Sequence, residues 1–140
     1  MDSIMPDLQA ALLCDDVRQE NNGKFMLIGL FDAIFAQQWP LRYARLFVVT
    51  RWCSGSGQFT QRTRILRPDQ KNLVVEGKPI NFQMNDPEML VTNIEGFFNL
   101  DFLTAGTHWI EVLLDGEMKI RFPLRLGLVP PHPAPPGVPA

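Results

Sequence analysis

Residues 106–126 read GTHWIEVLLDGEMKIRFPLRL, and this stretch holds the plainest strand pattern of the chain. From Met118 to Leu126 every second residue is apolar, and the residues between them are Lys, Arg or Pro. A period of two places the apolar side chains on one face of a strand and the charged ones on the other. A second apolar row, Ile110, Val112 and Leu114, precedes it. The stretch therefore predicts an antiparallel hairpin whose apolar face must be covered by a second sheet.

The connection between these two strands, residues 115–116, is Asp-Gly. A two-residue turn would bring the two apolar rows onto opposite faces, because a one-residue slip turns every side chain over. We therefore expect an odd-length connection in which Gly116 forms a left-handed bulge. This register pairs Val112 with Met118 and Ile110 with Ile120. In the second strand, Pro123 lacks a backbone N–H and predicts an edge position or a bulge.

Turn signals recur about every ten residues through the rest of the chain, which is typical of a sandwich. Lys24–Phe35 is apolar on both faces and predicts a central strand, with a bulge or a close backbone approach at Gly29 and a strand end at Asp32. Gly96 predicts a second bulge. The other expected strands are 8–18, 45–52, 58–66, 73–76, 80–84 and 90–102. The sequence predicts an all-β, antiparallel two-sheet sandwich of seven or eight strands.

Length and composition indicate one domain, which we expect to consist of a leader at 1–7, a sandwich at 8–128 and a Pro-rich tail at 129–140. The tail has six prolines among its last eleven residues and should be extended and loosely held. The net charge is -2, and no apolar run approaches the ~20 residues that span a bilayer. The acidic start lacks the basic and apolar regions of a signal peptide, which favours a cytoplasmic protein with free thiols at Cys14 and Cys53.

Residues that could carry chemistry are few and scattered. His108 alternates onto the apolar face of its strand and is expected to be a core histidine. Neither it nor the two cysteines has the spacing of a metal site, and the glycines do not follow the spacing of a phosphate loop. We therefore expect no catalytic residues, no cofactor and no metal.

One segment has an unusual charge. Residues 42–71 carry a net charge of +6, which leaves -8 for the rest of a chain whose total is -2. A basic hairpin can meet an anionic partner, although a solvated strand face that discourages edge aggregation is the commoner explanation. The candidate residues for an anion or partner patch are Arg45, Arg51, Arg62, Arg64 and Arg67.

Several short motifs together resemble an uncharacterised family of small bacterial proteins that carries a domain of unknown function. The motifs are Cys14-Asp15-Asp16, Gly23-Lys24, Ile28-Gly29-Leu30-Phe31-Asp32, Pro40 and the closing hairpin Gly106–Leu126. The resemblance covers most of residues 10–126 and implies an immunoglobulin-like β-sandwich in the bacterial cytoplasm. The chain departs from the family at His108, where a Tyr is common. The resemblance implies no activity, cofactor or catalytic residue.

These observations favour a non-enzymatic protein-interaction or scaffold module, whose partner is another protein or a second copy bound through a sheet face or edge. The apolar residues expected on outer faces are Phe47, Val49, Val91, Phe97, Trp109 and Leu113. The alternative is a sandwich that binds a sugar, a nucleotide or nucleic acid through segment 42–71; we favour nucleic acid least. No membrane partner is expected.

Overall fold

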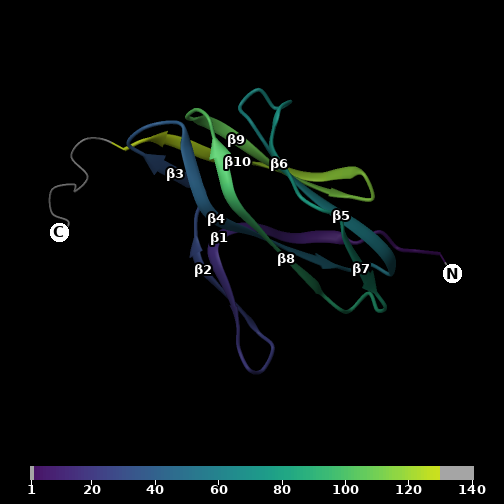
Figure 1. The fold of residues 1–140 in the computed structure, drawn as a ribbon. Coiled ribbons are helices and arrows are strands. Elements are labelled where there is room, and N and C mark those ends of the chain that lie inside the picture. Colours follow the sequence, from purple (N-terminus) through teal and green to yellow (C-terminus); the bar gives the residue numbers. More distant parts are fainter. Residues whose placement is uncertain (1, 130–140) are drawn as a thin grey trace.

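The structure, a computed structural model, describes residues 2–129 and contains strands but no helix in that range. The strands are β1 (Asp7–Gln19), β2 (Phe25–Leu30), β3 (Ala33–Ala36), β4 (Leu41–Cys53), β5 (Gly57–Leu66), β6 (Leu73–Glu76), β7 (Ile80–Met84), β8 (Val91–Phe102), β9 (Gly106–Leu114) and β10 (Glu117–Leu128). They form two sheets, with the orders β2-β1-β4-β8 and β3-β10-β9-β5-β6, and β7 also pairs with β5 (Figure 1). The prediction of an all-β, two-sheet fold is confirmed, but ten strands replace the seven or eight expected. No helix of the described residues could cross a membrane, and tail residues 130–140 lie outside the described residues.

The core lies between the inner faces of β4 and β8 in one sheet and of β5, β9 and β10 in the other. Alternate residues of β9, including Ile110, Val112 and Leu114, are fully buried, as their spacing predicts. One polar group bridges the two sheets inside this core. The Oε1 atom of Gln61 on β5 accepts hydrogen bonds from Thr50 Oγ1 at 2.7 Å, Trp52 Nε1 at 2.8 Å and Asn93 Nδ2 at 3.0 Å.

The turn of the β9–β10 hairpin differs from the expected one. Asp115 (φ 48°) and Gly116 (φ 82°) both have positive φ, and Leu114 lies opposite Glu117, so the turn has two residues. The extra residue lies instead within β10, at the register shift between Met118 and Ile120. That shift places Val112 opposite Ile120 and Ile110 opposite Phe122. The bulged turn and its pairs are therefore wrong, because a tight turn matches the strand twist and a later bulge returns the apolar rows to one face.

The expected central strand 24–35 is also wrong. It divides into β2, which is the edge of the four-stranded sheet, and β3, which pairs in parallel with β10 in the other sheet. The strand end at Asp32 is confirmed, since this exposed residue lies between the two strands. Gly29 has φ 72°, and a Cβ there would collide with the Asp15 carboxylate. The close contact at Gly29 is thus with a side chain rather than with another backbone, and the register of β1 with β2 passes it without the bulge that was the other possibility.

Gly96 does not form the predicted bulge, because it pairs in regular register with Phe47. A Cβ at Gly96 would lie 2.9 Å from ring atoms of Phe47 and Phe98, so the glycine makes room for two aromatic rings packed edge to face. The irregular residue in β8 is Asn99, with φ 54°. It changes the phase of the strand, and Phe97 and Leu100 both become buried.

Candidate protein-interaction site

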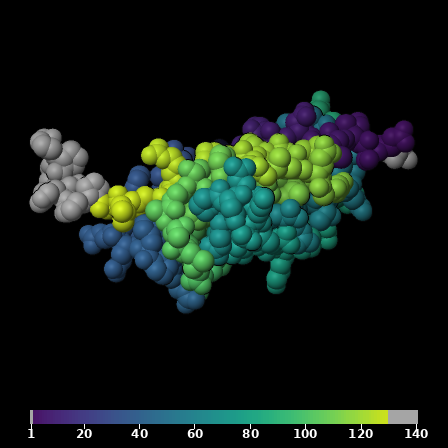
Figure 2. All heavy atoms as spheres, turned by 90° about the horizontal axis from the view of Figure 1, so that it is seen from above, coloured from purple at the N-terminus to yellow at the C-terminus, as the bar shows by residue number. Residues whose placement is uncertain are grey.

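The feature that stands apart from the sandwich is a two-stranded arm. Strand β1 pairs with β4 only as far as Cys14, which lies opposite Phe47. From Asp16 to Gln19 its strand partner is β2, in the register Asp16–Ile28 to Gln19–Phe25. We call residues 15–30 the arm. Figure 1 shows it projecting away from the two sheets, and in Figure 2 the blue segment that follows it lies at one end of the molecule.

The arm exposes apolar side chains on both of its faces. Phe25, Met26, Ile28 and Leu30 are between 42% and 60% exposed, and no residue of β2 is buried. Phe25 lies on one face of the hairpin, whereas Met26 and Ile28 lie on the other, because side chains alternate along a strand. A two-stranded hairpin is marginally stable in water by itself. The exposed surface of the arm therefore has the chemistry of a contact surface.

Asp16 makes two polar contacts within the arm and approaches one residue of the sandwich. The Asp16 carboxylate accepts hydrogen bonds from Arg18 Nε and from the Val17 N–H, both at 2.9 Å, and lies 3.8 Å from Arg45 Nη2 of β4. The hydrogen bond from Arg18 lowers the pKa of Asp16, and the Val17 N–H and the charge of Arg45 lower it further. These contacts keep Asp16 ionised, and the approach to Arg45 is the one of the three that joins the arm to β4.

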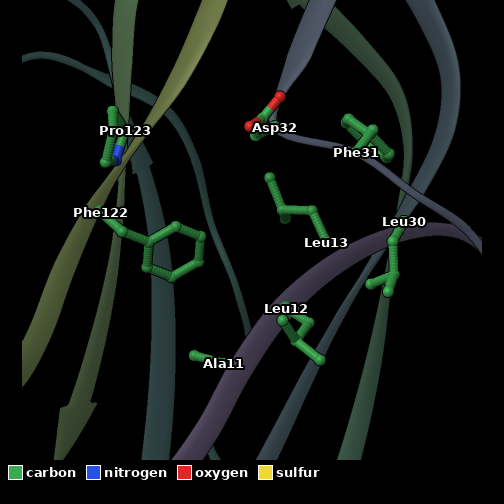
Figure 3. A pocket seen from close by; sticks show the side chains of 8 residues that line it. All are labelled: Ala11, Leu12, Leu13, Leu30, Phe31, Asp32, Phe122 and Pro123. Carbon is green, nitrogen blue, oxygen red and sulfur yellow. The ribbon is translucent and has the colours of Figure 1, made fainter.

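Two hollows flank the arm. The more apolar one, of about 630 Å³, lies between the arm and the sheet, and Leu12, Phe25, Leu27 and Val49 are among its lining residues, with Arg51 at its side. The other, of about 350 Å³, lies at the base of the arm, where the two sheets meet. Its lining residues are Ala11, Leu12, Leu13, Leu30, Phe31, Asp32, Phe122 and Pro123 (Figure 3). Both hollows are lined mainly by apolar groups.

The structure does not bring the predicted basic residues together. Arg45 and Arg51 lie on the outer face of β4, whereas Arg62 and Arg64 lie on β5 in the other sheet, on the face opposite the buried Gln61. Several are already engaged: Arg62 Nη1 and Arg64 Nε bind Glu76 at 3.2 and 2.6 Å, and Arg51 Nε donates to Thr92 Oγ1 at 3.1 Å. Arg67 follows the end of β5. The segment thus presents two separate pairs of arginines on opposite faces of the sandwich.

The apolar residues expected on outer faces are for the most part covered. Phe97 belongs to the core, Val49 and Leu113 are buried, and Val91 packs against the core cluster around Trp52. Phe47 and Trp109 are half-buried. Sequence reasoning missed the exposed residues of β2, because an apolar run without alternation was interpreted as a buried strand. The signal for the arm was that same run, placed directly after the turn residues Glu20–Lys24.

The potentially reactive side chains do not form a site. His108 is fully buried against Phe102, with ring centroids 5.2 Å apart, and its Nδ1 lies 3.1 Å from the carbonyl oxygen of Gly106. Burial lowers the pKa of His108 and raises the pKa of the Cys14 thiol, so both groups are held neutral. Cys14 and Cys53 are free, as predicted. Within residues 2–129 no three His, Cys, Asp or Glu side chains are grouped to hold a metal ion.

Comparisons with known proteins add one finding to this geometry. A search of curated proteins gave no match. The sequence model of a family of unknown function, DUF6941, matches residues 9–127, a range that includes the arm and both sheets. The chain therefore belongs to the DUF6941 family.

Proposed function

We propose that this protein is a non-enzymatic interaction module that binds another protein chain through the arm. The observation that carries the proposal is the exposure of apolar side chains on both faces of an edge strand that has no partner among the described residues beyond β1. A large apolar side chain has roughly 150–200 Å² of surface, so four half-exposed ones present on the order of 350 Å². Patches of that size on a monomer commonly mark interaction sites.

The strand order supports the view that the arm is an addition to a complete framework. In an immunoglobulin-like sandwich, strands A, B and E are neighbours in one sheet and C, F and G in the other. Strands β1, β4 and β8 match the first set and β5, β9 and β10 match the second, in chain order. On this immunoglobulin-like assignment the second half of β1 and β2 are an insertion between A and B. An insertion that the core does not need is available for binding.

Two further observations bear on the location of the protein and on the alternative function. The free thiols of Cys14 and Cys53 suit a reducing compartment, which supports a cytoplasmic protein. An anion site on segment 42–71 is less well supported, because Arg62 and Arg64 already share Glu76.

Site-specific photo-cross-linking in living cells of the source organism tests the role of the arm. A photoreactive residue replaces Ile28 on the arm or, as a matched control, Leu73 on β6; the two side chains are 45% and 43% exposed. We expect a discrete cross-linked protein from position 28 and none from position 73. Equal products at both positions, or no product at position 28, would contradict the proposal.

A further inference from the structure

We propose that the partner of the arm is a second copy of this chain, and that the two β2 strands pair antiparallel about a twofold axis at Met26. This inference rests on the proposed function and names the partner of that site. The joined arms would form a four-stranded sheet in the order β1, β2, β2 of the partner, β1 of the partner.

The first argument is that β2 is an unguarded edge. Natural edge strands are commonly protected by charges, Pro or bulges, but Phe25–Leu30 has neither charge nor Pro. The edge of β10 beside the smaller hollow, in contrast, is protected by a proline. Arg125 N donates to Asp32 O at 3.1 Å, so its N–H points toward β3. The N–H groups of residues two apart in a strand point to the same side, so the N–H of residue 123 would also point toward the side of β3. Residue 123 is Pro, which has no N–H, and β3 does not extend far enough to pair with it. That edge is therefore blocked, whereas β2 is open.

The second argument comes from the direction of the backbone groups. Glu20 N donates to Lys24 O at 2.8 Å, so the carbonyl of Lys24 faces β1. Because these groups alternate along a strand, the N–H and C=O groups of Phe25 and Leu27 face the open side. Within the range described by the structure they have no strand partner there. A partner strand would satisfy four exposed hydrogen-bonding groups.

The third argument is that the strand is complementary to itself. A twofold axis requires the same patch on both copies in antiparallel orientation. With the axis at Met26, Phe25 of each copy pairs with Leu27 of the other, and each pair exchanges two N–H···O bonds. Met26 then lies opposite its own equivalent. Every position from Phe25 to Leu27 meets an apolar residue, so no charge is buried.

The area sets the strength of the association. Pairing of the two edges covers the backbone groups and the flanks of the side chains from Phe25 to Leu27 but leaves the faces of the strand open, which places the interface among the small ones, below roughly 1,200 Å² in total. We therefore expect a reversible dimer with a dissociation constant in the micromolar range, on the order of the weaker specific complexes.

Sedimentation velocity over a concentration series tests the dimer and the surface. Met26→Lys places two like charges opposite each other and should raise the dissociation constant about tenfold or more. Leu73→Lys introduces the same charge at a similarly exposed position on another edge and should leave the dimer unchanged. A wild-type protein that is monomeric at every concentration, or a dimer that Met26→Lys leaves intact, would overturn self-pairing. A monomer that still cross-links another protein at position 28 would overturn self-pairing alone and leave the interaction role standing.

Disulfide trapping tests the register. In a Cys53→Ser background, Met26→Cys should form a covalent dimer on mild oxidation, because non-hydrogen-bonded antiparallel pairs lie about 4.5 Å apart at Cα, within disulfide range. Ile28→Cys faces Lys24 of the partner rather than itself and should remain largely monomeric. Circular dichroism checks that each variant is folded. Equal trapping at both positions, or trapping of Ile28→Cys alone, would contradict the proposed axis.

Discussion

The bridge between the two sheets permits a quantitative prediction about stability. Gln61 Oε1 accepts from three donors of the opposite sheet, Thr50, Trp52 and Asn93. Gln61, Thr50 and Trp52 are at most 1% exposed, so water cannot replace a lost partner. Removing the acceptor and removing one donor should therefore have very different costs.

Gln61→Met conserves the volume but removes the shared acceptor. Each buried donor left without a partner costs about 1–3 kcal/mol, so three of them should cost about 3–6 kcal/mol after partial relaxation. Thr50→Val removes one donor and leaves the oxygen with two, which should cost about 1 kcal/mol. Domains of this size are stable by about 5–15 kcal/mol, so the loss expected for Gln61→Met is a large fraction of the free energy of unfolding.

Urea denaturation followed by tryptophan fluorescence measures both free energies of unfolding on one scale. The reasoning requires the loss in Gln61→Met to be at least about twice the loss in Thr50→Val, with unchanged m-values. Equal losses would show that the three donors find other acceptors, and the bridge would then not hold the sheets together.

Three further predictions concern single residues. Gly116 has φ 82° with open space around it, so Gly116→Ala should cost about 1–2 kcal/mol of unfolding free energy through backbone strain alone, measured by the same urea titration; no loss would contradict the two-residue turn. Burial lowers the pKa of His108, so the histidine binds a proton more tightly in the unfolded chain than in the folded protein. The free energy of unfolding should therefore fall as the pH drops below about 6.5. Thermal melts of His108→Phe should lack this fall, and a fall as steep as that of the wild type would contradict the prediction. Burial raises the pKa of Glu95. The favourable contribution of this carboxyl group to the free energy of unfolding is therefore complete below its unfolded-state pKa and is lost as the pH rises through its pKa in the folded protein. Glu95→Gln should melt at a higher temperature than the wild type at pH 7, and a lower melting temperature would refute this.

The closing hairpin shows how far alternation carries a prediction. The apolar rows of residues 106–126 predicted two strands with one buried face, and the structure has both. The same rows require one extra residue between them but do not say where it lies. A bulge at Gly116 would place Met118 on the buried face opposite Val112, whereas the shift after Met118 pairs it with Leu113 and leaves it 48% exposed. From Ile120 onward both positions put the same residues on the inner face, and the twist of the hairpin decides between them. The sheet bridge at Gln61 was missed for a related reason, because a polar residue in a polar strand gives no sign that three donors face it.

The arm shows a different limit. Residues 25–30 have no alternation, and a strand that is apolar on both faces must be covered on both. A sequence does not record whether the cover comes from the same chain or from another one. The prediction of a central strand assumed the first, and the structure places the run at an edge, where the chain itself supplies one neighbouring strand. No residue of β2 is buried, so among the described residues neither face of this run is covered. The proposed dimer concerns the edge of this run rather than its faces, since pairing of two β2 edges would give it a strand neighbour on each side, as a central strand has.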